Sequence, residues 1–353
     1  MGNIMTNSAL SAKIRAMNGG TIKSADYEAL IKLKSVSDVA IYLQTNTRYK
    51  ASLALINSTQ IHRGELEKAL KTQLLSDIIS FAPFLNTSNR FFIEALELED
   101  GIEKLKLFLS LLLIGTPEKF GEYEFDIKGN KSTVDTKKLA KVKTFAEFME
   151  FIKSTIFYKA LISFENDPSR QQLFFLDIAL DNFYTEIIFK YAKKYLSGED
   201  YHHAMLAYGT KTDLRNIGYI LRSKARFSHT NEQIFTCIIP KYYKIKEATI
   251  TELVTAENYN MALDIIKSST PYAAAFDHDD RFIERRTNEY IYRLHKRESM
   301  LSPYSIQVAL GYIALRRFEI KNIVAIIEGI RYSLTPDEIR KYLIGFSGEE
   351  MKT

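Results

Sequence analysis

The chain has a single cysteine, Cys237, so it cannot form an intrachain disulfide. This cysteine lies in the apolar segment 234–239, whereas a reactive thiol needs cationic surroundings. We therefore predict a buried, inert thiol. Such low cysteine content fits a reducing compartment, although other compartments are also compatible with it.

The sequence also lacks a long apolar run. The most apolar segment, 105–114, contains Lys106 and Ser110 and ends at a Gly-Thr-Pro turn. It is well short of the roughly 20 apolar residues that span a bilayer. The N-terminus lacks the basic region followed by an apolar region that marks a secretory signal. We expect a soluble, cytoplasmic protein, which can still bind peripherally to a membrane complex.

Motifs for nucleotides, metals and catalysis are missing as well. Segment 129–132 ends like a phosphate-binding loop but lacks the earlier glycine, and no Gly-x-Gly-x-x-Gly fingerprint occurs. The six histidines include no pair at the i, i+4 spacing of a helical zinc site. The acidic segment 277–280 is better explained as a helix start than as a cation site. The sequence predicts no cofactor, no metal and no catalytic residue. The net charge of +5 is too small to favour nucleic acid.

What the sequence does have is helical spacing of its apolar residues. In segment 173–191 they form a broad stripe over several turns. We predict that this helix begins at 167–168 and ends at 197–198, where a glycine permits a left-handed cap. Similar helices are expected over 63–79 and 282–294. The alternating segment 122–127 lies inside the polar stretch 115–138, and we interpret this stretch as a loop or a small hairpin. These patterns favour an all-α fold.

The helical patterns occur three times. One block of aliphatic and tyrosine positions recurs without a gap at spacings of 109 and 114 residues: Leu30, Leu43 and Tyr49; Leu139, Ile152 and Tyr158; Leu253, Ile266 and Tyr272. A second block follows in each copy, at 101–105, 213–217 and 319–323. A threefold internal repeat predicts three similar lobes, which we place at residues 8–125, 126–240 and 241–347. We expect a pseudo-threefold, funnel-like arrangement, with each tyrosine filling the same core site in its lobe.

Arginines cluster on two of the predicted helices. Arg285, Arg286, Arg293 and Arg297 lie on one helix with glutamates between them, and a second run follows residue 213. Such a helix is either a solvated face with i, i+4 ion pairs or a contact for an acidic protein partner. The sequence alone leaves both interpretations open.

The second block of the repeat points to a family. Segment 213–222, Asp-Leu-Arg-Asn-Ile-Gly-Tyr-Ile-Leu-Arg, resembles the Asp-Leu-x-Asn-Leu…Arg helix of the central-stalk subunit of V-type and A-type rotary ATPases. This subunit is called C in prokaryotes and d in eukaryotes. Segments 11–17, 26–30 and 37–40 resemble the family's N-terminal helices, and the resemblance spans about residues 9–344.

The resemblance implies a non-catalytic coupling protein. It implies a funnel of three helical lobes that sits on the membrane proteolipid ring, on the cytoplasmic face, and receives the lower end of the rotating shaft. The protein would couple ATP turnover to proton or sodium transport without binding nucleotide itself. Asn216 and Arg222 match the family motif, and Asn322 matches it in the third copy. The first copy departs from the motif, with Gly101 in place of the acid and Lys104 in place of the asparagine.

The motif and the two basic runs define the candidate partner-binding residues. They are Arg215, Asn216, Arg222, Arg226, Arg285, Arg286 and Arg293. The alternative hypothesis is a helical-repeat scaffold that binds proteins unrelated to rotary ATPases. However, copies near 110 residues are long for stacked solenoid repeats of about 20–45 residues. An all-helical enzyme would be favoured only by a deep pocket holding perturbed carboxylates or histidines.

Overall fold

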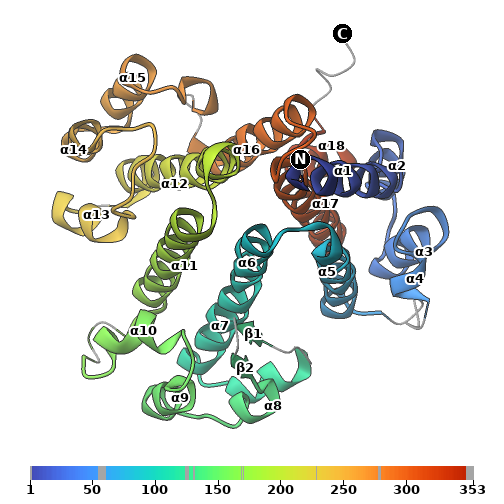
Figure 1. Ribbon diagram of the computed structural model, residues 1–353. Helices are drawn as coiled ribbons and strands as arrows, with labels where there is room; N and C mark the ends of the chain where they lie inside the picture. The colour runs from blue at the N-terminus through green and yellow to red at the C-terminus, as the bar shows by residue number, and fades with distance from the viewer. Residues whose placement is uncertain are drawn as a thin grey trace. The chain divides into compact units, whose positions relative to one another are not determined.

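The structure of the chain is a computed structural model. It describes residues 2–54, 61–123, 127–129, 132–167, 169, 171–227, 229–276 and 280–346. Most of these residues are helical (Figure 1). The sheet found in the described part is a two-stranded antiparallel hairpin of β1 (Ile127–Gly129) and β2 (Ser132–Val134). The all-α prediction is confirmed, and the hairpin lies inside the polar stretch 115–138 that predicted a loop or a small hairpin. Most of the acidic segment 277–280 lies outside the described residues.

The helices follow the same order three times along the chain. Short helices come first, longer helices follow, and a short helical segment ends each series; among the described residues, three α-helices take the middle place in the first series and two in each of the others. The first series is α2 (Ser24–Leu30), α3 (Val36–Asn46), α4 (Lys50–Leu53), α5 (Arg63–Ile79), η1 (Ala82–Phe84), α6 (Thr87–Ala95), α7 (Leu98–Leu113) and η2 (Pro117–Tyr123), preceded by α1 (Gly2–Asn18). The second is α8 (Thr136–Leu139), α9 (Phe145–Ile152), α10 (Tyr158–Leu161), η3 (Ile162–Phe164), α11 (Leu173–Tyr195), α12 (Gly198–Arg226) and α13 (Asn231–Cys237). The third is α14 (Glu247–Thr255), α15 (Tyr259–Ser269), η5 (Ala273–Ala275), η6 (Asp280–Phe282), α16 (Ile283–Leu301), α17 (Gln307–Arg331) and α18 (Pro336–Arg340).

The helix starts repeat in detail as well as in order. Ser35, Thr144 and Asn258 are the N-caps of α3, α9 and α15, each with an extended backbone. Each side-chain oxygen accepts a hydrogen bond from the amide three residues on, at 3.1, 3.2 and 3.0 Å. Such caps satisfy an amide that the first turn leaves open. The caps are spaced by 109 and 114 residues, as the repeat predicts. The predicted start of α11 at 167–168 is wrong, because the helix begins at Leu173.

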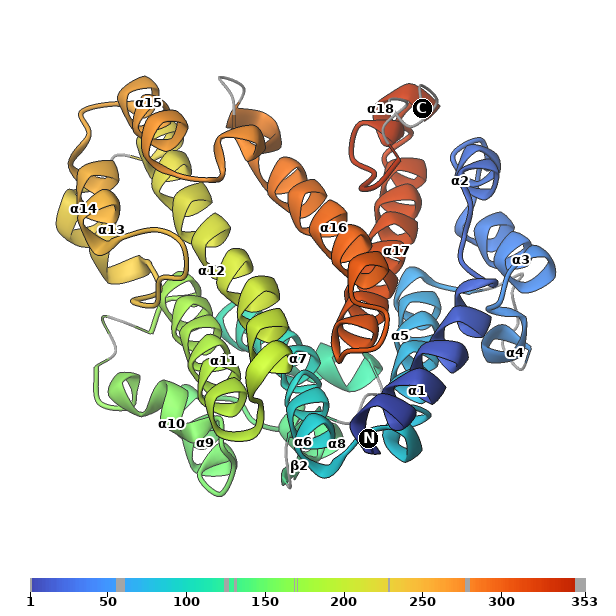
Figure 2. The same cartoon turned by 45° about the horizontal axis from the view of Figure 1, so that its top comes forward.

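The chain forms two compact units. Unit 1 comprises residues 1–86, 202–229 and 242–353, and unit 2 comprises 87–201 and 230–241. In unit 1, α16 and α17 form a hairpin, drawn side by side in Figures 1 and 2, and α1 and α5 also pack on α17. In unit 2, α11 packs on α6 and α7. The boundaries of the three predicted lobes stay a prediction.

The core of each unit is apolar. In unit 2 the ring of Phe108 lies 5.3 Å from that of Phe120 and 5.4 Å from that of Phe148, measured between centroids. Cys237 is buried, as predicted. Among the helices that the structure describes, none is long and apolar enough to cross a membrane.

A close approach within unit 1 makes one glycine sensitive to substitution. A Cβ added to Gly209 of α12 would lie 2.5 Å from Cγ and 2.7 Å from Cβ of Tyr243. We expect Gly209→Ala to lower the free energy of unfolding by about 1–3 kcal/mol through overpacking. The control is Gly64→Ala on α5, where nothing lies within 4 Å, and it should raise stability by up to about 1 kcal/mol. Urea unfolding measures both, and equal effects of the two variants would contradict this packing.

Candidate functional site

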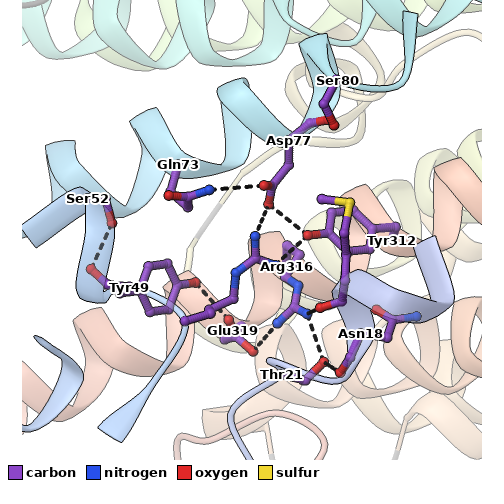
Figure 3. Close-up of polar contacts among 12 residues, drawn as sticks. Asn18, Thr21, Tyr49, Ser52, Gln73, Asp77, Ser80, Tyr312, Arg316 and Glu319 are labelled. Atoms are coloured by element: carbon purple, nitrogen blue, oxygen red, sulfur yellow. Dashed lines mark hydrogen bonds and ion pairs between the residues drawn. The ribbon is translucent and has the colours of Figure 1, made fainter. Parts of the chain in front are cut away.

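The most elaborate polar arrangement in unit 1 is a buried cluster around α17, drawn in Figure 3. We call it the α17 cluster. Its members are Arg48, Tyr49, Asp77, Tyr312, Arg316 and Glu319. They come from the α3–α4 turn, from α5 and from α17, so the cluster joins the first and last thirds of the sequence.

An ion pair between Arg316 and Glu319 is central to the cluster. Arg316 Nη1 donates to Glu319 Oε2 at 2.7 Å, and the two side chains are only 4% and 3% exposed. Arg316 Nη2 also donates to the carbonyl oxygen of Met17 at 3.2 Å and to Thr21 Oγ1 at 2.8 Å. The guanidinium of Arg316 therefore ties the end of α1 to α17.

Glu319 accepts further hydrogen bonds from the first third of the chain. The hydroxyl of Tyr49 donates to Oε1 at 2.7 Å, across 270 residues of sequence. The amide of Ile22 donates to Oε2 at 3.0 Å. Burial, and then the charge of Glu319, raise the pKa of Tyr49 well above its ordinary value. Tyr49 thus stays protonated and acts as a donor to the carboxylate.

A second carboxylate in the cluster, Asp77 of α5, is held in a similar way. Its Oδ2 accepts from Arg48 Nη2 at 2.6 Å and from the hydroxyl of Tyr312 at 2.7 Å. Its Oδ1 accepts from Gln73 at 3.0 Å. Arg48 also donates to the hydroxyl oxygen of Tyr312. Burial is the main cause that raises the pKa of Tyr312 to about 12.

The same kind of contact occurs on α12, at the corresponding acid of the motif. Asp213 is buried and accepts from the hydroxyl of Tyr272 at 2.8 Å. It also accepts from the amides of Tyr243 and Lys244, at 3.0 and 2.8 Å. Burial raises the pKa of Asp213, although these hydrogen bonds oppose the shift. Two motif acids therefore bind a repeated tyrosine of another copy. Asp213 of the second copy accepts from Tyr272 of the third, and Glu319 of the third copy accepts from Tyr49 of the first.

The second copy of the repeat has a phenylalanine at the position of the buried tyrosine. The hydroxyls of Thr47, Thr155 and Thr270 each accept a hydrogen bond at 3.2 Å from the amide two residues on. This amide belongs to Tyr49 and Tyr272 in two copies, and to the fully buried Phe157 in the second. The prediction that Tyr158 fills this core site is therefore wrong. Tyr158 is half-buried, and its hydroxyl donates to Glu165 at 2.8 Å.

The exchange of tyrosine for phenylalanine has a physical reason in the motif. The copy whose motif helix carries Gly101 has no acid to accept a buried hydroxyl. A buried hydroxyl without a partner costs free energy, whereas a phenyl ring has no polar atom to satisfy. The ring without a hydroxyl, Phe157, thus occurs together with the motif that lacks an acid, at Gly101. The two buried tyrosines occur together with the motif acids Asp213 and Glu319.

The structure separates the predicted partner-binding residues by exposure. On α12, Asn216 is buried, Arg215 and Arg222 are half-buried, and Arg226 is exposed. On α16, the structure leaves Arg285 and Arg286 half-buried and Arg293 exposed. Arg285 Nε donates to the carbonyl oxygen of Leu343 at 3.4 Å, and Arg293 Nε to Glu289 at 2.9 Å. Partner binding by these residues stays a prediction.

These clusters are built to hold helices together. Asp77, Asp213 and Glu319 each accept at least three hydrogen bonds, and these come from two or more segments of the chain. Groups that serve only as acceptors for fixed donors stabilise a packing arrangement. In the part of the chain that the structure describes, no group of three or more His, Cys, Asp or Glu side chains could hold a metal ion.

His295 of α16 makes the stability of unit 1 sensitive to pH. Burial, and then the charges of Lys211 and Arg317, lower its pKa from 6.5 to about 4. Between these values the unfolded chain binds a proton that the folded protein does not bind. Stability is therefore lost as the pH falls from 6.5 towards 4, by about 2 kcal/mol at roughly pH 5. Between pH 7 and 5, the free energy of unfolding should fall less in His295→Leu than in the unsubstituted protein. Urea unfolding at the two pH values measures this difference. An unchanged pH dependence would contradict this assignment.

Comparisons with known proteins identify the family. The model of the ATP synthase (C/AC39) subunit family matches residues 10–342. The C subunit of the A-type ATP synthase of Pyrococcus furiosus is 23% identical over 345 residues, which cover 94% of this chain and 88% of that protein. The corresponding protein of Pyrococcus horikoshii is 23% identical over 347 residues, covering 95% and 89%. That of Methanocaldococcus jannaschii is 25% identical over 225 residues, covering 61% and 56%.

The family match spans nearly the whole chain, so the resemblance seen in the sequence is confirmed. Asp213, the acid of the segment that carries the resemblance, is a buried carboxylate, and so is Glu319 at the corresponding position of the third copy. The chain belongs to the ATP synthase (C/AC39) subunit family, and it is therefore a non-catalytic subunit of a rotary ATPase rather than an enzyme in its own right.

Proposed function

We propose that this chain is the central-stalk subunit that couples the rotating shaft of an A-type rotary ATPase to the proteolipid ring in the membrane. The observation that carries the proposal is the family match over residues 10–342, together with A-type ATP synthase relatives that align along most of their length. The protein would transmit torque during ATP-linked proton or sodium transport. It would lie peripherally, on the cytoplasmic face of the membrane.

The buried clusters support this role because a torque coupler must resist shear. Arg316 and Glu319 fix α17 to segments almost 300 residues earlier in the sequence. Asp213 fixes α12 to Tyr272 and to the segment before α14. Buried, fully satisfied polar networks make packing specific and rigid. The proposed funnel of three lobes would be built from such contacts.

Exposed arginines supply a surface for the shaft. On α16, Arg293 and Arg297 have side chains that are 59% and 64% exposed. On α12, Arg226 is exposed as well. Arginine is well suited to ion pairs at protein interfaces, because its planar group binds carboxylates with two donors. We therefore propose an acidic surface on the shaft as the partner of these residues.

The test is a pull-down of tagged protein from solubilised membranes of the source organism, followed by mass spectrometry. We expect to recover the proteins of the shaft and of the proteolipid ring together, and no ATPase activity in the isolated protein. Recovery of unrelated soluble proteins in their place would contradict the coupling role and would favour the helical-repeat scaffold.

A further inference from the structure

The segment after α18 lies across three helices of unit 1. We call residues 341–346 the C-terminal strap. The buried side chain of Asn322, on α17, binds the strap through both polar groups of one residue. Its Nδ2 donates to the carbonyl oxygen of Ile344 at 2.8 Å, and its Oδ1 accepts from the amide of Ile344 at 2.8 Å. The ring of Phe346 contacts Tyr27 of α2, with 5.6 Å between centroids.

The next residue of the strap, Gly345, fixes it to α16. Its backbone is in the left-handed region at φ 69°, and a Cβ there would lie 2.4 Å from Cζ of Tyr292. Its amide donates to Oε2 of Glu289 at 2.7 Å. The strap therefore joins α16 to α17 and α2 through contacts that only glycine permits at this position.

Glu289 is shared between the strap and the surface. Its other oxygen, Oε1, accepts from Nε of Arg293 at 2.9 Å. The Glu289 side chain is 11% exposed, so most of the solvation of its charge comes from these two donors. One carboxylate thus links an exposed arginine of α16 to the backbone of the strap.

We propose that the strap is a latch on α16, and that an acidic protein surface loosens it by binding Arg293. When Arg293 turns to an outside carboxylate, Glu289 loses its counter-charge in a largely buried position. A buried charge without a partner is costly, and opening the strap lets water reach Glu289. The open state of the strap is thereby favoured only when Arg293 is bound to the acidic surface. The surface shifts the population because it binds the open state more tightly than the closed state. The identity of the acidic surface as the shaft rests on the proposed function, whereas the link from Arg293 to the strap does not.

Hydrogen exchange of the strap tests the link without any partner. The full chain is compared with Arg293→Ala and with the control Arg297→Ala. Arg297 lies one turn further on α16 and pairs with Glu298 at the surface. We expect exchange of the amides of residues 342–346 to become about two- to fivefold faster in Arg293→Ala, the range of a half-exposed ion pair, and to stay unchanged in Arg297→Ala. Equal exchange in the two variants would overturn the latch.

A second arm tests release by an acidic surface. Poly-L-glutamate added to the full chain should accelerate strap exchange by a similar factor, and should have no further effect on Arg293→Ala. Unchanged exchange of the unsubstituted chain at saturating poly-L-glutamate would overturn release by an acidic partner. Failure of the pull-down combined with faster exchange in Arg293→Ala would contradict only the proposed function.

Discussion

Arg316→Ala is expected to lower the free energy of unfolding by about 3–5 kcal/mol, because it removes one partner of a buried ion pair and leaves the other charge behind. Glu319 would keep its hydrogen bonds from Tyr49 and from the amide of Ile22, but neither donor carries a positive charge. The end of α1 would also lose the donor to Met17 and Thr21. Urea unfolding followed by circular dichroism measures the loss.

Arg331→Ala, on the same helix, is the matched control. Arg331 pairs with Glu328 at 2.9 Å, but its side chain is 51% exposed. Exposed pairs contribute no more than about 1 kcal/mol, so this variant should remain near the unsubstituted protein. If Arg316→Ala and Arg331→Ala unfold at the same urea concentration, the cluster around Glu319 does not hold α17 as described.

Asp213→Ala should have an effect of similar size on α12. The substitution would leave the hydroxyl of Tyr272 and the amides of Tyr243 and Lys244 without their acceptor. A buried donor that loses its partner costs about 1–3 kcal/mol, and partial relaxation makes a total of about 3–5 kcal/mol the expected loss. Thermal or urea unfolding checks this value.

A graded series distinguishes the loss of the whole acceptor from the loss of a single donor. Tyr272→Phe removes one donor and leaves Asp213 its two amides, so it should cost about 1–2 kcal/mol. Asp337→Ala changes an 84% exposed carboxylate and should cost less than about 1 kcal/mol. The expected order is Asp213→Ala, then Tyr272→Phe, then Asp337→Ala. A loss in Tyr272→Phe equal to that in Asp213→Ala would mean that the amides do not depend on the carboxylate.

The helical elements can be predicted from the sequence because apolar periodicity and capping residues act locally. The partners of the motif acids cannot be predicted in this way. Glu319 and Tyr49 are both repeated positions in the sequence, but their contact spans 270 residues. Local patterns do not say which copy supplies the tyrosine to a given helix. That choice depends on how the copies pack, which is a property of the folded chain.

The second copy shows how a regular spacing can mislead. The gapless alignment of the copies places Tyr158 with Tyr49, whereas the threonine two residues before each buried ring identifies Phe157 as the counterpart. The Thr-x-Tyr and Thr-x-Phe segments are present in the sequence. So is Gly101, whose missing acid accords with a ring that lacks a hydroxyl.

The candidate partner-binding residues illustrate a second limit of the sequence. Asn216 matches the family motif, yet its side chain is buried, and its counterpart Asn322 binds the C-terminal strap. A match to a motif does not reveal whether a side chain faces solvent or a neighbouring segment. On α16 the same limit applies, because Arg293 is exposed whereas Arg285 and Arg286 are half-buried.

The most direct test of the coupling role is ATP-driven ion transport by the rotary complex reconstituted in lipid vesicles, with and without this chain. We expect the complex lacking the chain to hydrolyse ATP without moving ions, and we expect the added chain to restore transport. Equal transport with and without the chain, at equal hydrolysis, would contradict the coupling role.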